Sequence, residues 1–153
     1  MDVKIWTLDP AKMAYVEHVG PYEEIGKAWE KLCSWAGPAS LFSPATKFYG
    51  VYRDDPGQVP PEELRSEACV TIENEIDAPA EIKFKDFPGG KFAVTTHLGP
   101  YENLKETWTE FYEQWLPQSG ETHAEAPCYE QYMNDPKSTK PEHLVTILLM
   151  PLK

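Results

Sequence analysis

The stretch HVGPYE at residues 18–23 occurs a second time as HLGPYE at residues 97–102, 79 positions further along the chain. A second motif, YRDDP at 52–56, recurs as YMNDP at 132–136. Self-similarity at a fixed period indicates that one supersecondary unit is used twice. The sequence therefore predicts two copies of one unit, related by a pseudo-twofold axis.

The repeats set the expected boundaries. We expect a single domain over 1–153, with pseudo-repeats at 1–73 and 80–153 joined by the polar segment 74–79. Each copy reads as strand, strand, helix, strand, strand. From alternation and turn residues, strands are predicted at 3–8, 13–19, 48–53, 64–72, 82–87, 91–98, 128–133 and 143–152.

Helices are predicted after the two Gly-Pro pairs. Apolar residues at 22, 25, 29, 32 and 36 form one helical stripe, which Gly37 and Pro38 end. The second copy repeats this spacing from Tyr101 to Trp115, and we expect Pro117 to end that helix. The first two strands of each copy are expected to pair as hairpins, across residues 9–12 and 88–90.

Two such units bury their apolar faces best when they share one sheet. The predicted fold class is α+β: an eight-stranded, mostly antiparallel sheet with two helices on one face. We expect a groove along the pseudo-dyad between the helices, and concave apolar sites are where small ligands bind.

Charge and cysteine content exclude several function classes. The chain has 14 basic and 25 acidic residues, a net charge of −11, which repels nucleic-acid phosphates and anionic membranes. The same net negative charge favours the binding of cations, although a need for solubility alone would also explain the excess of acidic residues. Three unclustered cysteines and an N-terminus without a signal pattern indicate a reduced, cytoplasmic protein.

Metal and cofactor signatures are absent from the sequence. There is no glycine-rich phosphate loop and no His-Glu-x-x-His pair, so we expect no metal and no cofactor. His18 and His97 are repeat-related and precede the helices, which favours a local capping or packing role. Cys69 and Cys128 lie in predicted strands and are expected to pack as small apolar groups.

The two copies differ at one position that carries chemistry. Aligning the third strands places Glu130 at the position of Gly50, and alternation puts Cys128, Glu130 and Tyr132 on one face. If that face meets the helix, a carboxylate is buried among aromatic rings, at a cost of several kcal/mol or with a raised pKa. Pairing with a bound cation or acid–base chemistry would use such a group. The alternative is that Glu130 points to solvent or bonds a tyrosine.

These motifs, taken in order, resemble one family over essentially the whole chain. Residues 97–102, the helix containing Trp108, and PCYEQYMNDP at 127–136 are similar to the GyrI-like (SbmC) proteins. That family includes the effector-binding domains of AraC- and MerR-type multidrug regulators such as Rob and BmrR. The resemblance implies the two-copy fold, a small-molecule groove, and a glutamate at position 130 that engages cationic aromatic drugs. Unlike those regulators, this chain is expected to lack a helix-turn-helix domain, so we do not expect it to control transcription by itself.

Three functions follow as hypotheses. The first is binding of a drug-like or toxin-like small molecule by a monomer, with aromatic rings supplying stacking and cation–π faces. The second, implied by the resemblance, is hydrolysis of strained cyclopropane rings, with Glu130 and Tyr112 as the acid–base pair and Tyr132 in reserve. The third is modulation of DNA gyrase through an acidic surface. The candidate ligand-binding residues are Glu130, Trp29, Trp108, Phe111, Tyr112, Phe48, Tyr52 and Tyr132, of which Phe111, like Leu32, is also a core candidate.

Overall fold

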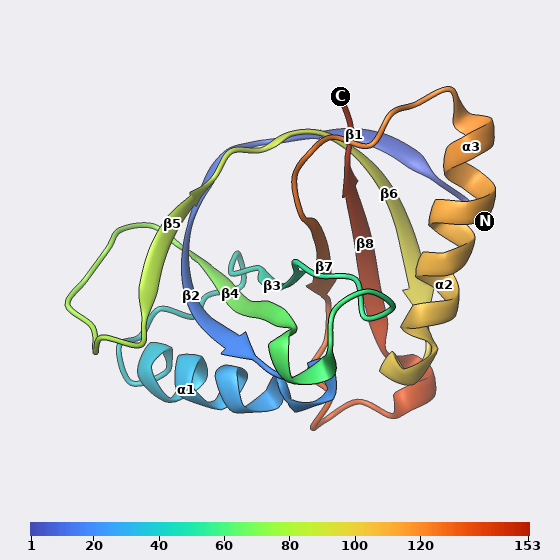
Figure 1. The fold of residues 1–153 in the computed structure, drawn as a ribbon. Coiled ribbons are helices and arrows are strands. Elements are labelled where there is room, and N and C mark those ends of the chain that lie inside the picture. Colours follow the sequence, from blue (N-terminus) through green and yellow to red (C-terminus); the bar gives the residue numbers. More distant parts are fainter. The chain divides into compact units, whose positions relative to one another are not determined.

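The structure, a computed structural model that describes residues 1–153, has an α+β fold with an eight-stranded antiparallel sheet and two principal helices (Figure 1). The expected fold class is confirmed, and all eight predicted strands form. They are β1 (Lys4–Leu8), β2 (Ala11–Val19), β3 (Phe48–Tyr52), β4 (Arg65–Ile72), β5 (Lys83–Phe87), β6 (Gly90–Leu98), β7 (Cys128–Tyr132) and β8 (Val145–Pro151).

The chain divides into two compact units. Unit 1 comprises Met1–Leu8 and Gly90–Lys153, and unit 2 comprises Asp9–Gly89. These bounds differ from those of the sequence repeats because β1 pairs with β6 of the second copy, and β5 of the second copy pairs with β2 of the first. The single domain with repeats at 1–73 and 80–153, and the groove between the copies, stay predictions.

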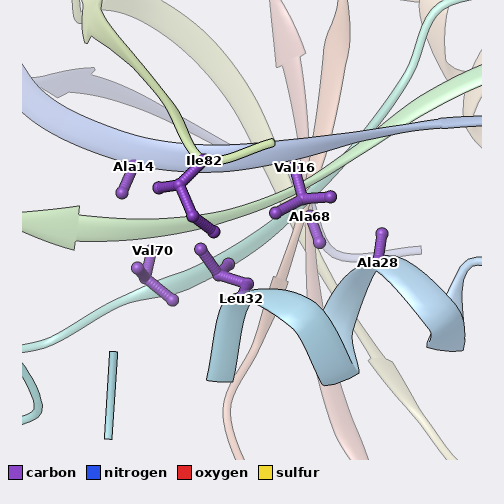
Figure 2. Close-up of a cluster of buried hydrophobic side chains, with 7 residues drawn as sticks. All are labelled: Ala14, Val16, Ala28, Leu32, Ala68, Val70 and Ile82. Carbon is purple, nitrogen blue, oxygen red and sulfur yellow. The ribbon is translucent and has the colours of Figure 1, made fainter. Parts of the chain in front are cut away.

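Unit 2 has the strand order β3-β4-β2-β5 and one helix, α1 (Gly26–Ala36), which follows a short 3₁₀ turn, Tyr22–Glu24. The helix ends where Gly37 and Pro38 predict. Figure 2 shows Leu32 of α1 directed toward side chains from the strands. The buried cluster contains Ala14, Val16, Ala28, Leu32, Ala68, Val70 and Ile82. Burying a leucine side chain contributes about 1.5–3 kcal/mol, so the apolar stripe fixes this face of α1 on the sheet.

Unit 1 has the strand order β1-β6-β8-β7. Its helical segment runs through α2 (Leu104–Glu110), a π-helical turn (Phe111–Trp115) and α3 (Leu116–Ser119). Phe111 is completely buried, in a cluster with Ala93, Leu104, Leu148, Met150 and Leu152.

The expectation that Pro117 ends the second helix is wrong. Helical structure continues to Ser119 and stops at Gly120, whose φ of 78° is the left-handed cap conformation that glycine adopts easily. A proline ring normally clashes with the carbonyl one turn earlier. Here the π-helical turn, which is wider than an α-helical turn, immediately precedes α3 and leaves room for the ring.

The two expected hairpins are also wrong. β1 pairs with β6 rather than β2, and β2 pairs with β5 and β4. Leu8 of β1 lies opposite Gly90 in unit 1, and Ala11 of β2 lies opposite Phe87 in unit 2. The strands that were expected to form hairpins therefore belong to different units.

The connecting residues give the physical reason. Asp9 and Pro10 lack the glycine or asparagine that a two-residue hairpin turn requires, and Pro10 holds φ near −65°, which suits extended backbone. Proline cannot donate to a ladder, so pairing is interrupted where the chain passes from one unit to the other.

The second repeated motif is a turn. In unit 2, Asp54 accepts from the backbone N–H of Arg65 at 2.8 Å, and Asp55 accepts from Gly57 N–H at 2.8 Å. In unit 1, Asn134 and Asp135 make the same bonds to Val145 and Lys137. Short polar side chains that bond nearby backbone stabilise such turns, so this motif is explained by folding. No helix of the chain is long and apolar enough to cross a bilayer.

Candidate functional site

The carboxylate of Glu130 is held by two donors from its own unit. Trp108 Nε1 donates to Oε2 at 2.7 Å, and Tyr132 OH donates to Oε1 at 2.8 Å. Only 5% of Glu130 is exposed. Glu130 therefore lies out of water within reach of an aromatic ring. It also bonds a tyrosine, which was part of the alternative to a functional role, and its place in a groove stays a prediction.

Strand alternation and helix spacing produce this arrangement. Cys128, Glu130 and Tyr132 occupy alternate positions on β7, so they share a face. Trp108 and Tyr112 are four residues apart in the helical segment, which puts both on the side that meets this face. Trp108 contacts Glu130, and Tyr112 contacts Cys128 at 2.7 Å.

A further tyrosine, which the sequence analysis did not place in the site, completes the aromatic surroundings. Tyr101 packs on Tyr132 with ring centroids 5.5 Å apart. Burial, and secondarily the charge of Glu130, raises the pKa of Tyr101. Tyr22 makes the equivalent contact with Tyr52 in unit 2, so the repeat itself was the signal that could have identified Tyr101.

The expected partner of Glu130, Tyr112, points elsewhere. Its hydroxyl lies 2.7 Å from Cys128 Sγ and 3.3 Å from His123 Nε2. Tyr132, the reserve candidate, is the tyrosine whose hydroxyl meets the carboxylate. The catalytic roles of these residues stay predictions.

The remaining aromatic candidates divide between core and unit 2. Phe111 is completely buried beneath Trp108, with ring centroids 5.8 Å apart, so it belongs to the core of unit 1. Trp29 and Phe48 pack on each other in unit 2 at 6.3 Å, and Tyr52 lies against Tyr22. The structure therefore brings together Glu130, Trp108, Tyr112 and Tyr132 in unit 1, and ligand contact by any of these residues stays a prediction.

The repeat-related histidines have the local role that the sequence predicts. His18 Nε2 lies 3.0 Å from the carbonyl of Pro21, and His97 Nε2 lies 3.1 Å from that of Pro100. His97 alone of the two also contacts a threonine, Thr107, at 2.7 Å. No three His, Cys, Asp or Glu side chains come together as a metal-binding group.

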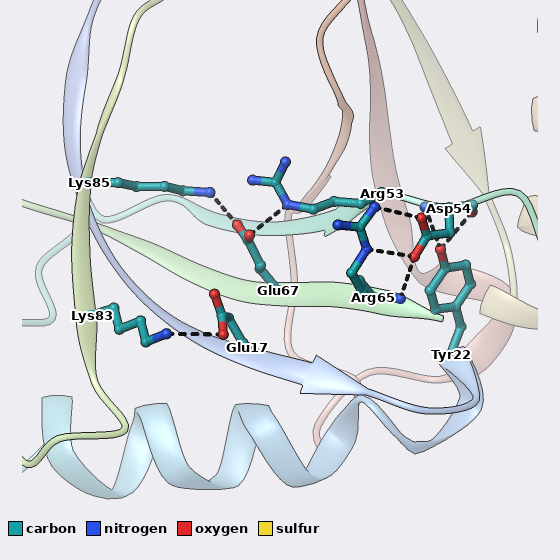
Figure 3. A network of polar contacts seen from close by, with 8 residues as sticks. All are labelled: Glu17, Tyr22, Arg53, Asp54, Arg65, Glu67, Lys83 and Lys85. Carbon is teal, nitrogen blue, oxygen red and sulfur yellow. Dashed lines mark hydrogen bonds and ion pairs between the residues drawn. The ribbon is translucent and has the colours of Figure 1, made fainter. Parts of the chain in front are cut away.

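A second buried carboxylate, Glu67 in unit 2, was not recognised from the sequence. It bonds Arg53 Nε at 2.7 Å and also Lys85 (Figure 3). Burial pushes the pKa of Glu67 upward, but the bonds from Arg53 and Lys85 outweigh burial and lower it. Glu67 is thus a charge compensated by two cations.

Two surface depressions lie away from Glu130. One, of about 440 Å³ in unit 2, is lined by His18, Lys27 and Lys31 among others. The other, of about 400 Å³ in unit 1, lies beside His97 and Thr107. Both are open and mainly polar, so neither has the aromatic lining of the Glu130 site.

Comparison with known proteins identifies the family. The profile of the GyrI-like small molecule binding domain matches residues 1–153. The chain belongs to the GyrI-like family. A DNA gyrase inhibitor of Erwinia billingiae is 31% identical over 140 residues, covering 88% of each chain. The probable transcriptional regulator YgiV of Escherichia coli K12 is 28% identical over 155 residues, covering 99% of this chain and 96% of YgiV.

Solved structures share the fold of this GyrI-like domain at low identity. The regulator EcmrR, in a complex with DNA, superposes with a TM-score of 0.85 at 15% identity over 99% of this chain, which spans 57% of EcmrR. A hydrolase encoded by lin2189 of Listeria innocua gives 0.75 at 15% identity, covering 99% and 92% of the two chains. SAV2435 bound to tetraphenylphosphonium gives 0.70 at 16%, covering 100% and 94%.

Proposed function

We propose that this GyrI-like small-molecule-binding domain binds aromatic cations, with the carboxylate of Glu130 as the charged contact. The observation that carries the proposal is an acid only 5% exposed and hydrogen-bonded by Trp108 and Tyr132. These two bonds hold the carboxylate in one orientation, and a charge acts more strongly in a low-dielectric setting than in water.

The aromatic rings suit the other half of such a ligand. Trp108 and Tyr112 lie 5.8 Å apart, and Tyr101 and Tyr132 lie 5.5 Å apart. The faces of tryptophan and tyrosine attract cations by about 0.5–2 kcal/mol each and stack on flat rings. SAV2435, which shares the fold, is bound to an aromatic cation, tetraphenylphosphonium, and this supports the same ligand class here.

Calorimetric titration with tetraphenylphosphonium tests the proposal. Glu130→Gln keeps the shape and removes the charge, so we expect binding at least tenfold weaker, since a bond to a charged group contributes about 1.5–3 kcal/mol. Glu17→Gln, which removes an exposed acid of unit 2, is the matched control and should bind as the unmodified protein does. Equal affinity of Glu130→Gln and the unmodified protein would refute the role of the charge.

The contact between Glu130 and Tyr132 also supports a second candidate, hydrolysis of a strained ring. A carboxyl and a phenol 2.8 Å apart can deliver one proton and direct one water. The fold likeness to a Listeria innocua hydrolase supports testing it. Incubation with a spirocyclopropane alkylator should give the water adduct by mass spectrometry, at a rate that falls at least a hundredfold in Tyr132→Phe. Equal product from a sample lacking the protein would exclude this activity.

A further inference from the structure

Three reactive side chains meet in unit 1 beside the Glu130 site. Cys128 Sγ lies 2.7 Å from Tyr112 OH and 3.4 Å from His123 Nε2, and the last two atoms are 3.3 Å apart. The thiol, the imidazole and the phenol thus form a closed triangle. We call it the Cys128 cluster.

Each member comes from a different, well-anchored segment. Tyr112 lies in the π-helical turn, a local widening that often occurs at functional positions. His123 is fixed by a β-bridge to Leu152, and Cys128 begins β7. The helical segment, the β-bridge and the strand therefore hold the three side chains together.

The protonation states suit a thiol with a neighbouring base. Burial, together with the charge of Glu130, raises the pKa of Cys128 to about 11, so at neutral pH the sulfur keeps its proton. Burial lowers the pKa of His123, which keeps the imidazole neutral and able to accept that proton. Burial raises the pKa of Tyr112, which keeps its hydroxyl as a donor that stabilises a thiolate as it forms.

The cluster can be reached from the surface. Tyr112 is 39% exposed, and Cys128 and His123 are half-buried. Cys69, in contrast, is completely buried in β4. Because Tyr112 is part exposed and its hydroxyl meets the sulfur, its aromatic ring offers a planar conjugated molecule a stacking partner beside Cys128.

We propose that Cys128 is a base-assisted nucleophile that forms thioethers with small conjugated carbonyl compounds. His123 takes the thiol proton as sulfur bonds to the β-carbon. The π electrons of the carbon–carbon double bond move toward the carbonyl oxygen to give an enolate. The α-carbon of this enolate then takes the proton back from His123, which restores the neutral imidazole, so no other reactant is needed. This covalent reaction goes beyond the proposed binding of cations at Glu130 and does not depend on it.

The experiment uses N-ethylmaleimide and follows adduct formation at each cysteine by peptide mass spectrometry from pH 5 to 9. Cys33, which is also half-buried, and Cys69 serve as internal references. We expect Cys128 to react fastest, with a rate that rises as His123 loses its proton and then levels off. An unassisted thiol would instead react tenfold faster for each pH unit up to its own pKa.

Variants distinguish a role of His123 as a base from a merely structural role. His123→Gln should slow the reaction of Cys128 at pH 7 at least tenfold and remove the plateau, since general-base assistance contributes about 10²–10⁴-fold. His143→Gln, at an exposed histidine in the 3₁₀ turn Pro141–His143, should change nothing. If His123→Gln unfolds, Cys69 will also react. In that case the pH profile of the unmodified protein shows whether a base assists Cys128. A profile without a plateau, or a Cys128 no faster than Cys33, would overturn the proposal.

Discussion

Trp108 and Glu130 join the helix and the sheet of unit 1 through a 2.7 Å hydrogen bond. In unit 2 the repeat-related tryptophan, Trp29, packs on the ring of Phe48, and the glutamate is replaced by Gly50. One fold unit is therefore used with an apolar contact in one copy and an acid-centred contact in the other. The duplicated sequence keeps the scaffold, and the two copies differ in the contact that joins helix and sheet.

Replacing Trp108 by phenylalanine should destabilise the protein by about 1–3 kcal/mol. The change keeps an aromatic ring over Phe111 and removes the N–H that satisfies Glu130 Oε2. Leaving a buried acceptor without a donor lowers the free energy of unfolding by more than the hydrogen bond itself contributed. Urea unfolding, with the slope held constant, measures the loss.

The matched control is Trp35→Phe in unit 2, where the ring packs edge-on against Phe84 at 6.0 Å. It removes similar volume without disturbing a buried carboxylate, so we expect the smaller loss there. Equal losses for the two variants would mean that the Trp108 bond contributes nothing beyond packing.

The Glu67 cluster should make stability depend on acid pH. Because the pKa of Glu67 is lowered in the folded state, its contribution is complete above the unfolded value of 4.5 and is lost as pH falls through the folded value. Glu67→Gln leaves Arg53 and Lys85 without their shared anion and should cost about 3 kcal/mol at pH 7. The difference from the unmodified protein should shrink toward pH 3.

Glu17 provides the control for this prediction. Its ion pair with Lys83 is about half exposed at both ends, so Glu17→Gln should cost less than about 1 kcal/mol (Figure 3). Unfolding curves of both variants at pH 7 and pH 3 make the comparison. A Glu67→Gln loss that stays the same at pH 3 would contradict the assigned cause.

Most of the fold was predictable because its signals are local. Strand alternation, the apolar helix stripe and the Gly-Pro breaks each depend on neighbouring residues, and the repeat supplied a second copy of every signal. Strand pairing was not predictable in the same way. Asp9 and Pro10 lie between two strands, and only the long-range register of Leu8 with Gly90 shows that the chain does not reverse there.

The candidate site was also predictable only where its signals are local. The alternation that put Cys128, Glu130 and Tyr132 on one face was sufficient to bury the acid beneath the helix. Sequence could not say which hydroxyl reaches Glu130, because that depends on side-chain directions in the π-helical turn that carries Tyr112. His123 was missed because its contact with Cys128 depends on a loop brought in by a single β-bridge.

Thr107→Val tests the asymmetry of the two histidines. Thr107 is repeat-related to Ala28, and its hydroxyl lies 2.7 Å from Nδ1 of the buried His97. Removing it leaves a buried ring nitrogen without this partner, which should cost about 1–3 kcal/mol in urea unfolding. Thr109→Val, two residues further on and exposed, loses only a bond to its own helix backbone and should cost under about 0.5 kcal/mol. Similar costs would show that the His97 contact adds no stability.

The pairing of β1 with β6 predicts which engineered cysteines form a disulfide. Thr7 lies opposite Lys91, and both are exposed, so Thr7→Cys with Lys91→Cys should join on mild oxidation. A hairpin across Asp9 and Pro10 would instead place Thr7 opposite Lys12, so Thr7→Cys with Lys12→Cys should stay reduced. Peptide mapping under non-reducing conditions distinguishes these bonds from any made by the three native cysteines. A disulfide between positions 7 and 12, with none between 7 and 91, would mean that the chain reverses at Pro10 after all.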